Sequence, residues 1–244
     1  GAGQNIGRST AIEFARQGAN VYFTDIDQEK IDQLEKDLED ICGNYNGSLF
    51  DVSEKEDNDK LVRLLVLNKI NIDILVNNVG ISDDSPRLED YDFDRDVEIL
   101  KTNVVGPKYL TKLVFENFMK EKGQGLIVFL SSIHQDHIRR FPTYSASKGA
   151  VKMLIKELAL ELAPYNVRVN GVAPGYTELD ENSRPFPHED TPLGNCSIDP
   201  WCIAREILHL CSEYSGRTTG SIRKVDAGLS LVNHLYYELP PGKD

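Results

Sequence analysis

The spacing of apolar residues along the chain predicts alternating helices and strands. Residues 28–41 place apolar side chains three or four positions apart among charged ones, as an amphipathic helix does, at Ile31, Leu34, Leu38 and Ile41. Residues 72–76 instead form a short, mainly apolar run that contains Asp73 and is followed by Asn77, as a buried parallel strand entering a loop does. The two kinds of segment can therefore be told apart.

Both patterns recur from one end of the chain to the other. Helices are expected over residues 6–17, 28–41, 53–68, 94–118, 144–163 and 200–212. Strands are expected over residues 20–24, 47–52, 72–76, 125–130, 167–172 and 221–225. This alternation predicts an α/β fold with a doubly wound parallel sheet that carries helices on both faces. Because no repeat or linker divides the chain, residues 1–244 are expected to form a single domain.

Composition and charge narrow the possible functions. The chain has 244 residues, with 27 Lys and Arg against 39 Asp and Glu, a net charge of −12, and no basic stripe. Because nucleic-acid binding relies on cations at the phosphates, this balance argues against a nucleic-acid partner. No apolar run approaches the roughly 20 residues that span a bilayer, and the first residues are not a signal peptide. We therefore expect a soluble, cytoplasmic protein with no membrane partner.

Cysteines and histidines indicate no metal site. No C-x-x-C pair occurs among the four cysteines, so free buried thiols are expected rather than a disulfide or a zinc site. His134 and His137 lie three residues apart, but the sequence shows no third ligand beside them. No metal is therefore expected.

The start of the chain suits a phosphate group. Its first residues, Gly1-Ala2-Gly3-Gln4-Asn5-Ile6-Gly7, lead into a helix, where glycines let the main chain approach a pyrophosphate at the positive helix end. Alone this is a weak signal, because such turns are common. Asp25 ends the first expected strand, 18 residues after Gly7, where a carboxylate can bind an adenosine ribose and repel a 2′-phosphate. Taken singly, Asp25 could equally cap the next helix, but the pair favours a dinucleotide, and NAD over NADP.

Tyr144 and Lys148 are the strongest local signal for chemistry. Four residues apart on an expected helix, the phenol and the ammonium share one face, and the cation lowers the pKa of the phenol from about 10 toward a useful range. Ser132 closes an expected strand 12 residues earlier and would bring a hydroxyl near the phenol. The pattern Tyr-x-x-x-Lys also occurs by chance, with a surface Tyr/Lys pair as the alternative. Other polar motifs follow strands or sit on helices, namely Asp51-Val52, Asn77-Asn78-Val79-Gly80, Asn103 and Pro174-Gly175.

In this order, the motifs resemble the short-chain dehydrogenase/reductase family over the full length of the chain. The resemblance implies a Rossmann-like fold and a reversible, NAD-linked conversion of a secondary alcohol to a ketone, or of an aldose to a lactone. The cofactor-binding residues that it implies are Gly1, Gly3, Asn5, Ile6, Gly7, Asp25, Ile26, Asp51, Val52, Asn78, Val79, Gly80, Tyr144, Lys148, Pro174, Gly175 and Thr177.

The resemblance also implies a role for each catalytic residue. Tyr144 would exchange the proton with the substrate oxygen, and Ser132 would hydrogen-bond that oxygen. Lys148 would hold the nicotinamide ribose and lower the pKa of Tyr144, while Asn103 would support a water that leads protons to solvent. Nearby Ser131 is a minor alternative to Ser132, because the spacing to the tyrosine is one residue shorter than the family pattern.

Three further positions depart from the family pattern. The middle glycine of the loop is Asn5, the alanine before Gly80 is Val79, and a threonine expected four residues after Gly175 is Leu179, so that Thr177 is taken to contact the nicotinamide amide. The positions where NADP-preferring members carry a cation hold Gln4 and Ile26. Only Arg8 would then be available to pair with a 2′-phosphate.

The substrate is less well defined by the sequence. A lid is expected at about residues 176–191, and the polar stretch 133–143 suits a sugar, a polyol or another small hydroxylated compound, with His134 and Tyr176 as the expected substrate contacts. A hydroxysteroid or a 3-oxoacyl thioester is the alternative, which would need an apolar lid. A non-catalytic dinucleotide sensor is the alternative of another class, and the intact Ser132, Tyr144 and Lys148 argue against it.

Two expectations concern the ends of the chain. Apolar residues are dense after position 228, so we expect this tail to pack against a partner subunit in a dimer or tetramer; they are Leu229, Leu231, Val232, Leu235, Tyr236, Tyr237 and Leu239. A central strand normally precedes a dinucleotide loop, and the motifs of this chain begin with the loop itself. We therefore expect a first strand of about 8–12 residues ahead of Gly1.

Overall fold

The computed structural model describes residues 1–41, 44–83, 88–138, 140–179, 185, 187 and 191–232. Its middle layer consists of parallel strands that form two separate hydrogen-bonded groups. The first pairs β1 (Val21–Asp25) with β2 (Tyr45–Leu49). The second has the order β3 (Ile74–Asn77), β4 (Gly125–Leu130), β5 (Val167–Pro174) and β6 (Ile222–Val225).

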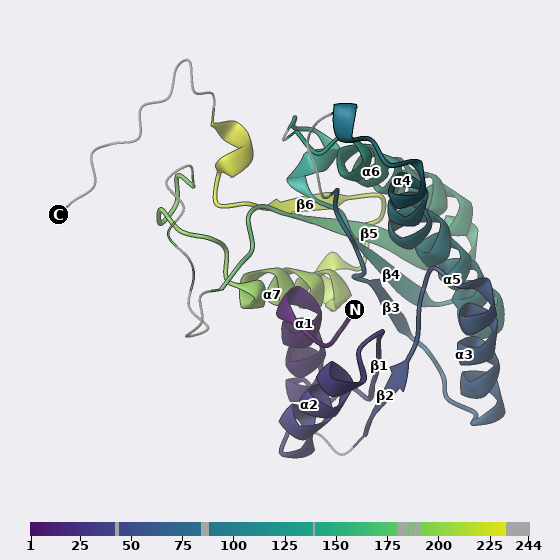
Figure 1. Ribbon diagram of the computed structural model, residues 1–244. Coiled ribbons are helices and arrows are strands. Elements are labelled where there is room, and N and C mark those ends of the chain that lie inside the picture. The colour runs from purple at the N-terminus through teal and green to yellow at the C-terminus, as the bar shows by residue number, and fades with distance from the viewer. Residues whose placement is uncertain are drawn as a thin grey trace.

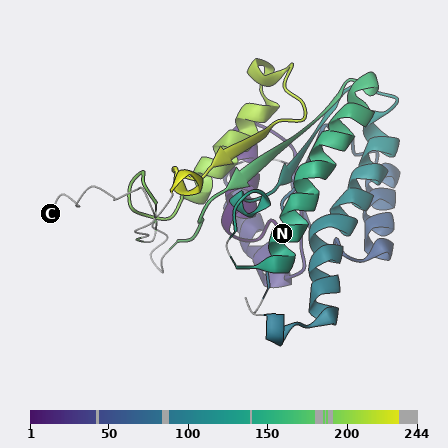
Figure 2. The ribbon, with the colours of Figure 1, turned by 90° about the horizontal axis from the view of Figure 1, so that it is seen from above.

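Helices cover both faces of this layer (Figures 1 and 2). One face carries α1 (Asn5–Arg16), α2 (Gln28–Glu39) and α7 (Pro200–Cys211). The other carries α3 (Lys55–Leu67), α4 (Phe93–Leu100), α5 (Gly106–Val114) and α6 (Pro142–Leu162). The predicted α/β fold, a Rossmann-like parallel sheet with helices on both faces, is therefore confirmed.

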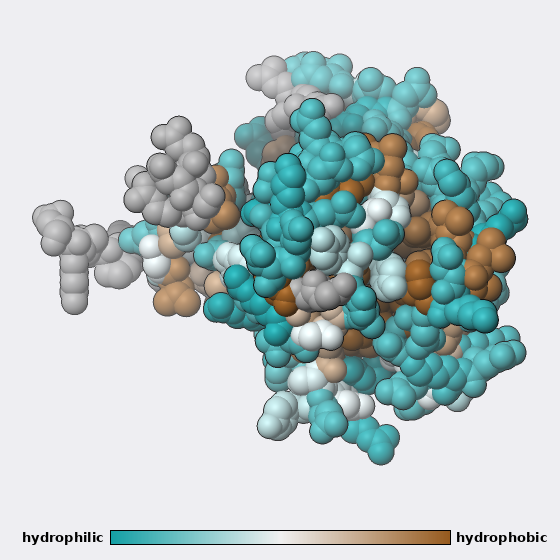
Figure 3. All heavy atoms as spheres, turned by 90° about the horizontal axis from the view of Figure 1, so that it is seen from below, coloured by the Kyte–Doolittle hydropathy of each residue, from teal (hydrophilic) through white to brown (hydrophobic). Residues whose placement is uncertain are grey.

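Strand β4 shows why the sequence adopts this arrangement. Its alternate residues Ile127 and Phe129 pack into the core under α3, α5 and α6, while Leu126, Val128 and Leu130 pack into the core under α7. Because successive side chains of a strand point to opposite faces, an uninterrupted apolar run suits a strand that is covered on both sides. Figure 3 shows that hydrophilic residues cover much of the face seen from below, with hydrophobic ones toward its middle.

The first residues of the chain lie between the two groups of strands. The backbone N–H of Ala2 donates to the carbonyl oxygen of Thr24 in β1, and the side chain of Asn78, just after β3, donates to the carbonyl oxygen of Gly1 at 2.6 Å. Gly1 and Ala2 thus contact the ends of both groups. The expected strand ahead of Gly1 stays a prediction, since no described residue tests it.

One expected helix is not continuous. In place of a helix over 94–118, α4 passes into a π-helical turn (Lys101–Val105), then α5, then a second π-helical turn (Phe115–Met119). The first break has a cause in the sequence, because Pro107 has no N–H to donate to the carbonyl of Asn103 four residues earlier. Next to it, Gly106 packs closely against the backbone of Val52, whose oxygen lies 2.1 Å from the point where a Cβ would be.

Three smaller expectations are corrected or lie outside the described residues. Helix α6 begins two residues before Tyr144, because Pro142 suits the first helical position. The thiols are less buried than expected, since Cys202 is exposed and Cys196 and Cys211 are half-buried, although all three are free. Most of the expected lid and the tail beyond Val232 lie outside the described residues.

Candidate active site

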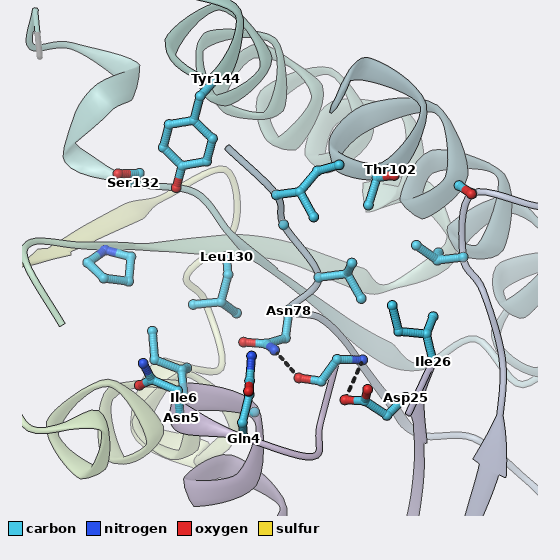
Figure 4. Close-up of a pocket in the computed structure, with 18 of the residues that line it drawn as sticks. Gln4, Asn5, Ile6, Asp25, Ile26, Asn78, Thr102, Leu130, Ser132 and Tyr144 are labelled. Carbon is cyan, nitrogen blue, oxygen red and sulfur yellow. Dashed lines mark hydrogen bonds and ion pairs between the residues drawn. The ribbon is translucent and has the colours of Figure 1, made fainter. Parts of the chain in front are cut away.

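The candidate site is a cavity of about 500 Å³ at the carboxyl ends of the strands, as expected for an open parallel sheet (Figure 4). Most of the residues predicted from the sequence line it, namely Gly1, Asn5, Ile6, Gly7, Asp25, Ile26, Asp51, Val52, Asn78, Val79, Gly80, Ser132, Tyr144, Lys148, Pro174, Gly175 and Thr177. Residues separated by more than 170 positions in the sequence, such as Gly1 and Thr177, thus line the same cavity.

Four predicted residues do not line the cavity. Gly3 lies behind its wall and donates its N–H to the Asp25 carboxylate at 2.8 Å. Asn103 also lies behind the wall, where it bonds both main-chain groups of Ile81. His134 packs edge-on against the ring of Tyr144, with 5.0 Å between the ring centroids. Tyr176 is hydrogen-bonded to the Glu178 carboxylate.

One end of the cavity meets the N-terminus of α1. Asp27, Asp92 and Asp199 cap α2, α4 and α7 with their carboxylates, whereas Gln4 makes no side-chain cap at α1 and the first turn of α1 holds no acidic residue. The first N–H groups of a helix lack intrahelical partners and carry a partial positive charge. This helix end is therefore suited to an anion such as a pyrophosphate.

Asn5 replaces a glycine in this turn and adopts a glycine-like backbone. Its φ is +47°, in the left-handed region, which asparagine tolerates better than most residues. Its side chain donates to the carbonyl oxygen of Thr177 at 3.3 Å, across the mouth of the cavity. The departure from the family pattern therefore preserves the shape of the loop.

Asp25 and its neighbours lie beside the glycine turn, at the same end of the cavity. Asp25 is buried, and its two carboxylate oxygens accept the N–H groups of Gly3 and Asp27 at 2.8 and 3.2 Å. Arg8, the expected partner for a 2′-phosphate, instead pairs with Asp37 of α2 at 2.6 Å. A cation that the sequence analysis missed, Lys30, does line this end and pairs with Asp27 at 3.5 Å. The sequence feature that could have pointed to Lys30 was its place in the first turn of α2, soon after Asp25.

Ser132 and Tyr144 meet at the far end from Asp25 (Figure 4). Figure 4 shows the phenol pointing toward the Ser132 side chain, which hydrogen-bonds it. Burial raises the pKa of Tyr144, and this hydrogen bond opposes the rise. Ser131 is turned elsewhere, because its hydroxyl donates to Gln135 at 2.8 Å and contacts the carbonyl oxygen of Lys148 at 3.3 Å. Of the two serines, only Ser132 thus faces the phenol.

Lys148 lies beneath this pair. Its ammonium donates to the carbonyl oxygen of Leu130 at 2.9 Å, and burial lowers its pKa to about 8. Gly80 faces it closely, since a Cβ on Gly80 would lie 3.1 Å from Nζ. The amine is therefore fixed between β4 and the loop after β3.

A match to a known family accompanies this geometry. The family model described as short chain dehydrogenase matches residues 1–189 of the chain. The protein is a member of the short chain dehydrogenase family. A 3-oxoacyl-[acyl-carrier-protein] reductase of Thermotoga maritima is 34% identical over 240 residues, which cover 95% of this chain and 96% of that protein. The family resemblance inferred from the motifs is thus confirmed.

Solved structures agree on the fold. An acetoin dehydrogenase from Enterobacter cloacae superimposes with a TM-score of 0.88 at 27% identity, covering 97% of both chains. A 3-ketoacyl-(acyl-carrier-protein) reductase from Brucella melitensis, complexed with NADH, gives a TM-score of 0.84 at 29% identity and covers 94% of this chain and 96% of that one. As a short chain dehydrogenase, the protein is an oxidoreductase that acts on a small molecule with a nicotinamide dinucleotide.

The described residues of the polar stretch after Ser132 make several contacts within the protein. His134 lies against Tyr144, and its Nδ1 is 3.1 Å from the hydroxyl of Ser145. Asp136 instead pairs with Lys152, and His137 lies 3.2 Å from the ammonium of Lys224. Most of these polar groups therefore have partners of their own.

The described residues contain neither a membrane-spanning helix nor a cluster of metal ligands. No helix among them is long and apolar enough to cross a membrane. Within the same residues, no three His, Cys, Asp or Glu side chains gather as a metal site would require.

Proposed function

We propose that this short chain dehydrogenase interconverts a secondary alcohol and a ketone, or an aldose and a lactone, with NAD(H) as cofactor and Tyr144 as general acid and base. One observation carries the proposal. Ser132, Tyr144 and Lys148 line one end of a cavity whose other end is lined by the buried Asp25. A single cavity thus joins a proton-transfer site to a site suited to an adenosine ribose.

The residues present fit a dinucleotide. The uncapped N-terminus of α1 would hold the pyrophosphate, Asp25 would accept the ribose hydroxyls, and the cavity walls at Asp51-Val52 and Asn78-Val79-Gly80 would flank the adenine and the nicotinamide ribose. When bound, the nicotinamide supplies the acceptor or donor of the hydride. The other contributions come from the side chains of this chain.

NAD is favoured over NADP by charge. In the proposed binding mode Asp25 would face a 2′-phosphate and repel it, and Arg8 is paired with Asp37. Lys30 is the only side-chain cation in the lining of the cavity near Asp25 among the described residues, and it pairs with Asp27. The Brucella melitensis structure was solved with NADH, which supports the same choice.

Tyr144 and Ser132 would manage the proton at the substrate oxygen. In the direction of oxidation, the phenolate oxygen of Tyr144 takes the hydroxyl proton while Ser132 donates a hydrogen bond to the same substrate oxygen. Burial alone raises the pKa of Tyr144, so it opposes this step. The Lys148 cation would counteract this rise in the pKa of Tyr144, because an adjacent positive charge favours the phenolate.

Lys148 and Asn103 would complete the proton path. One N–H of the Lys148 ammonium donates to Leu130, which leaves two for ribose hydroxyls. Asn103 lies behind Ile81, within the π-helical turn, and would support a water that passes protons to solvent. The amide of Asn103 fixes the wall, since it bonds both the N–H and the C=O of Ile81 at 2.9 and 2.8 Å.

The substrate class is proposed as a sugar, polyol or other small hydroxylated compound, bound near His134 and Tyr176 under a lid at about residues 176–191. A second candidate is a 3-oxoacyl thioester, which the 34% identity to the Thermotoga maritima reductase favours. We also keep the dimer or tetramer, the cytoplasmic location and a single domain over residues 1–244 as predictions.

The test is a substrate panel with a matched variant. NAD reduction is measured with polyols, aldoses and simple secondary alcohols, and NADH oxidation with acetoacetyl thioesters. Tyr144→Phe keeps the ring and removes the hydroxyl, so it should lose turnover by at least about 100-fold while still binding NADH. Wild-type turnover in Tyr144→Phe would overturn the mechanism, and turnover of thioesters alone would favour the second candidate.

A further inference from the structure

The main chain of Tyr144 is held on both sides by side chains that do not reach the cavity. The Asp83 carboxylate accepts its N–H at 3.2 Å, and the Ser147 hydroxyl donates to its carbonyl oxygen at 2.7 Å. Neither Asp83 nor Ser147 lines the cavity. Neither side chain can therefore touch a bound substrate or cofactor, but both bear on the position of the residue that carries the phenol.

Asp83 substitutes for a cap that α6 lacks. The residue before the helix, Phe141, makes no side-chain cap, and Pro142 has no N–H to satisfy. The N–H of Tyr144 lies in the first turn, so it has no partner within the helix. A carboxylate from 61 residues earlier in the chain fills that role, at the positive end of the helix where an anion is stabilised.

Ser147 connects Tyr144 to the other wall of the cavity. Ser147 is fully buried, and besides donating to Tyr144 its hydroxyl accepts a hydrogen bond from the side chain of Asn103 at 3.0 Å. The same Asn103 amide also bonds Ile81, which lines the cavity. A continuous set of hydrogen bonds therefore runs from the wall at Ile81 to the carbonyl of Tyr144.

The short segment 81–83 joins the two contacts. Ile81 is fixed by Asn103, and the carbonyl oxygen of Ser82 accepts from the guanidinium of Arg95 at 3.0 Å. Asp83 then reaches the N–H of Tyr144. Because the segment is bonded at each of its three residues, a shift of the cavity wall is transmitted to the residue that carries the phenol.

We infer that Asp83 and Ser147 are positioning residues that fix the phenol of Tyr144 relative to the cavity wall at Ile81. The inference rests on the proposed function of Tyr144. Removing either contact leaves the cofactor-binding residues in place and misplaces the proton-transfer group. Such an error lowers turnover much more than it weakens binding, since catalysis depends on near-attack geometry.

The experiment compares Asp83→Ala, Asp83→Asn and Ser147→Ala in the full chain, with Asp199→Ala as the matched control. Like Asp83 at α6, Asp199 accepts an N–H from the first turn of a helix, in this case that of Trp201 in α7. No residue of α7 lines the cavity. In Asp83→Ala, kcat should fall about 10-fold while the KM for NAD changes less than about 2-fold. Asp83→Asn keeps an acceptor and should restore kcat. Asp199→Ala should lower the melting temperature and leave kcat unchanged.

Two further measurements separate positioning from general stability. If both residues act on the same displacement of Tyr144, the loss in the double variant Asp83→Ala/Ser147→Ala should be smaller than the product of the single losses. Hydrogen exchange at the Tyr144 amide, measured by NMR, should accelerate in Asp83→Ala and return to the wild-type rate in Asp83→Asn.

Several results would overturn the inference. They are a wild-type kcat in Asp83→Ala, a loss that Asp83→Asn does not restore, or an equal loss of kcat in Asp199→Ala. Turnover that survives in Tyr144→Phe would instead overturn the proposed function. In that case the exchange rate of the Tyr144 amide still shows whether Asp83 holds this main chain.

Discussion

The ammonium of Lys148 lies over the ring of Tyr144, with Nζ 5.4 Å from the ring centroid. No carboxylate among the described residues offsets its burial, and this burial lowers its pKa to about 8. A buried cation destabilises the folded chain while it supports a phenolate at the site. Stability and function therefore make opposite demands on this one side chain.

Replacing Lys148 by methionine should separate the two demands. A pKa lowered from 10.5 to about 8 corresponds to roughly 3 kcal/mol of unfavourable burial at neutral pH. The variant also loses the hydrogen bond to Leu130, worth about 1–3 kcal/mol. We therefore expect Lys148→Met to be no less stable than the wild type at pH 7 in urea unfolding, although turnover falls by at least about 100-fold.

The pH dependence of this difference checks its cause. Because the pKa of Lys148 is lower in the folded state, the unfolded chain holds more protons between about pH 8 and 10.5, so stability of the wild type rises with pH in that window. Lys148→Met lacks this contribution. The stability of the variant relative to the wild type should fall by about 2 kcal/mol between pH 7 and 9.5. A pH-independent difference would show that burial of the cation is not responsible.

Asn5 is expected to hold the phosphate turn at a small cost in stability. Its left-handed backbone is strained for any residue with a Cβ, so Asn5→Gly should stabilise the fold by about 0.5–1 kcal/mol and Asn5→Ala should destabilise it by about 1 kcal/mol. The affinity for NAD should stay within about 3-fold in Asn5→Gly, since the contact to Thr177 is exposed.

A matched position distinguishes strain from binding. Asn195 has a similar φ of +48° but does not line the cavity. Asn195→Gly should give the same gain in stability, measured by urea unfolding, without any change in NAD affinity. A loss of NAD binding in Asn5→Gly, measured by calorimetry, would mean that the asparagine side chain itself holds the cofactor.

The cofactor preference should respond to Asp25 and Lys30 together. Asp25→Ser removes the charge that repels a 2′-phosphate and keeps an acceptor for the N–H of Gly3. Lys30 then remains as a cation in the lining of the cavity. We expect the ratio of kcat/KM for NADP to that for NAD to rise by about 10- to 100-fold.

The role of Lys30 is isolated by a second substitution. In Asp25→Ser/Lys30→Met, the use of NADP should fall back because no cation faces the added phosphate, whereas the use of NAD should stay as in Asp25→Ser. Equal use of NADP by the single and double variants would exclude Lys30 as the phosphate partner. An unchanged cofactor ratio in Asp25→Ser would remove Asp25 from its proposed role.

The sequence was most informative where a local pattern decides the structure. The apolar run of β4 predicts the strand Gly125–Leu130 at its observed bounds, because both faces of that strand are covered. Alternation along the chain also predicts that Ser131 and Ser132 point to opposite sides, and the structure directs Ser132 toward Tyr144 and Ser131 toward Gln135.

Features that depend on contacts between distant segments could not be predicted in this way. The cap that Asp83 provides for α6 joins positions 61 residues apart, and no local motif marks it. Lys30 enters the cavity only because α2 packs beside the glycine turn, where the Cβ of Lys30 lies 2.4 Å from the point a Cβ on Gly3 would occupy. Pro107 is a local sequence feature that could have predicted the π-helical turn at Asn103. The apolar spacing of residues 94–118 instead suggested one continuous helix.

Gly80 offers the most direct check on the placement of Lys148. A Cβ at Gly80 would lie 3.1 Å from Nζ of Lys148 and 3.7 Å from the side-chain oxygen of Asn103, so Gly80→Ala should push the ammonium away from Leu130 and lower kcat about 10-fold. Gly149→Ala is the control on the neighbouring residue of α6, because a Cβ there meets nothing within 4 Å. It should raise stability by about 0.5–1 kcal/mol through helix propensity and leave kcat unchanged. If steady-state kinetics give Gly80→Ala the same kcat as Gly149→Ala, the ammonium does not need its contact with Leu130 for turnover.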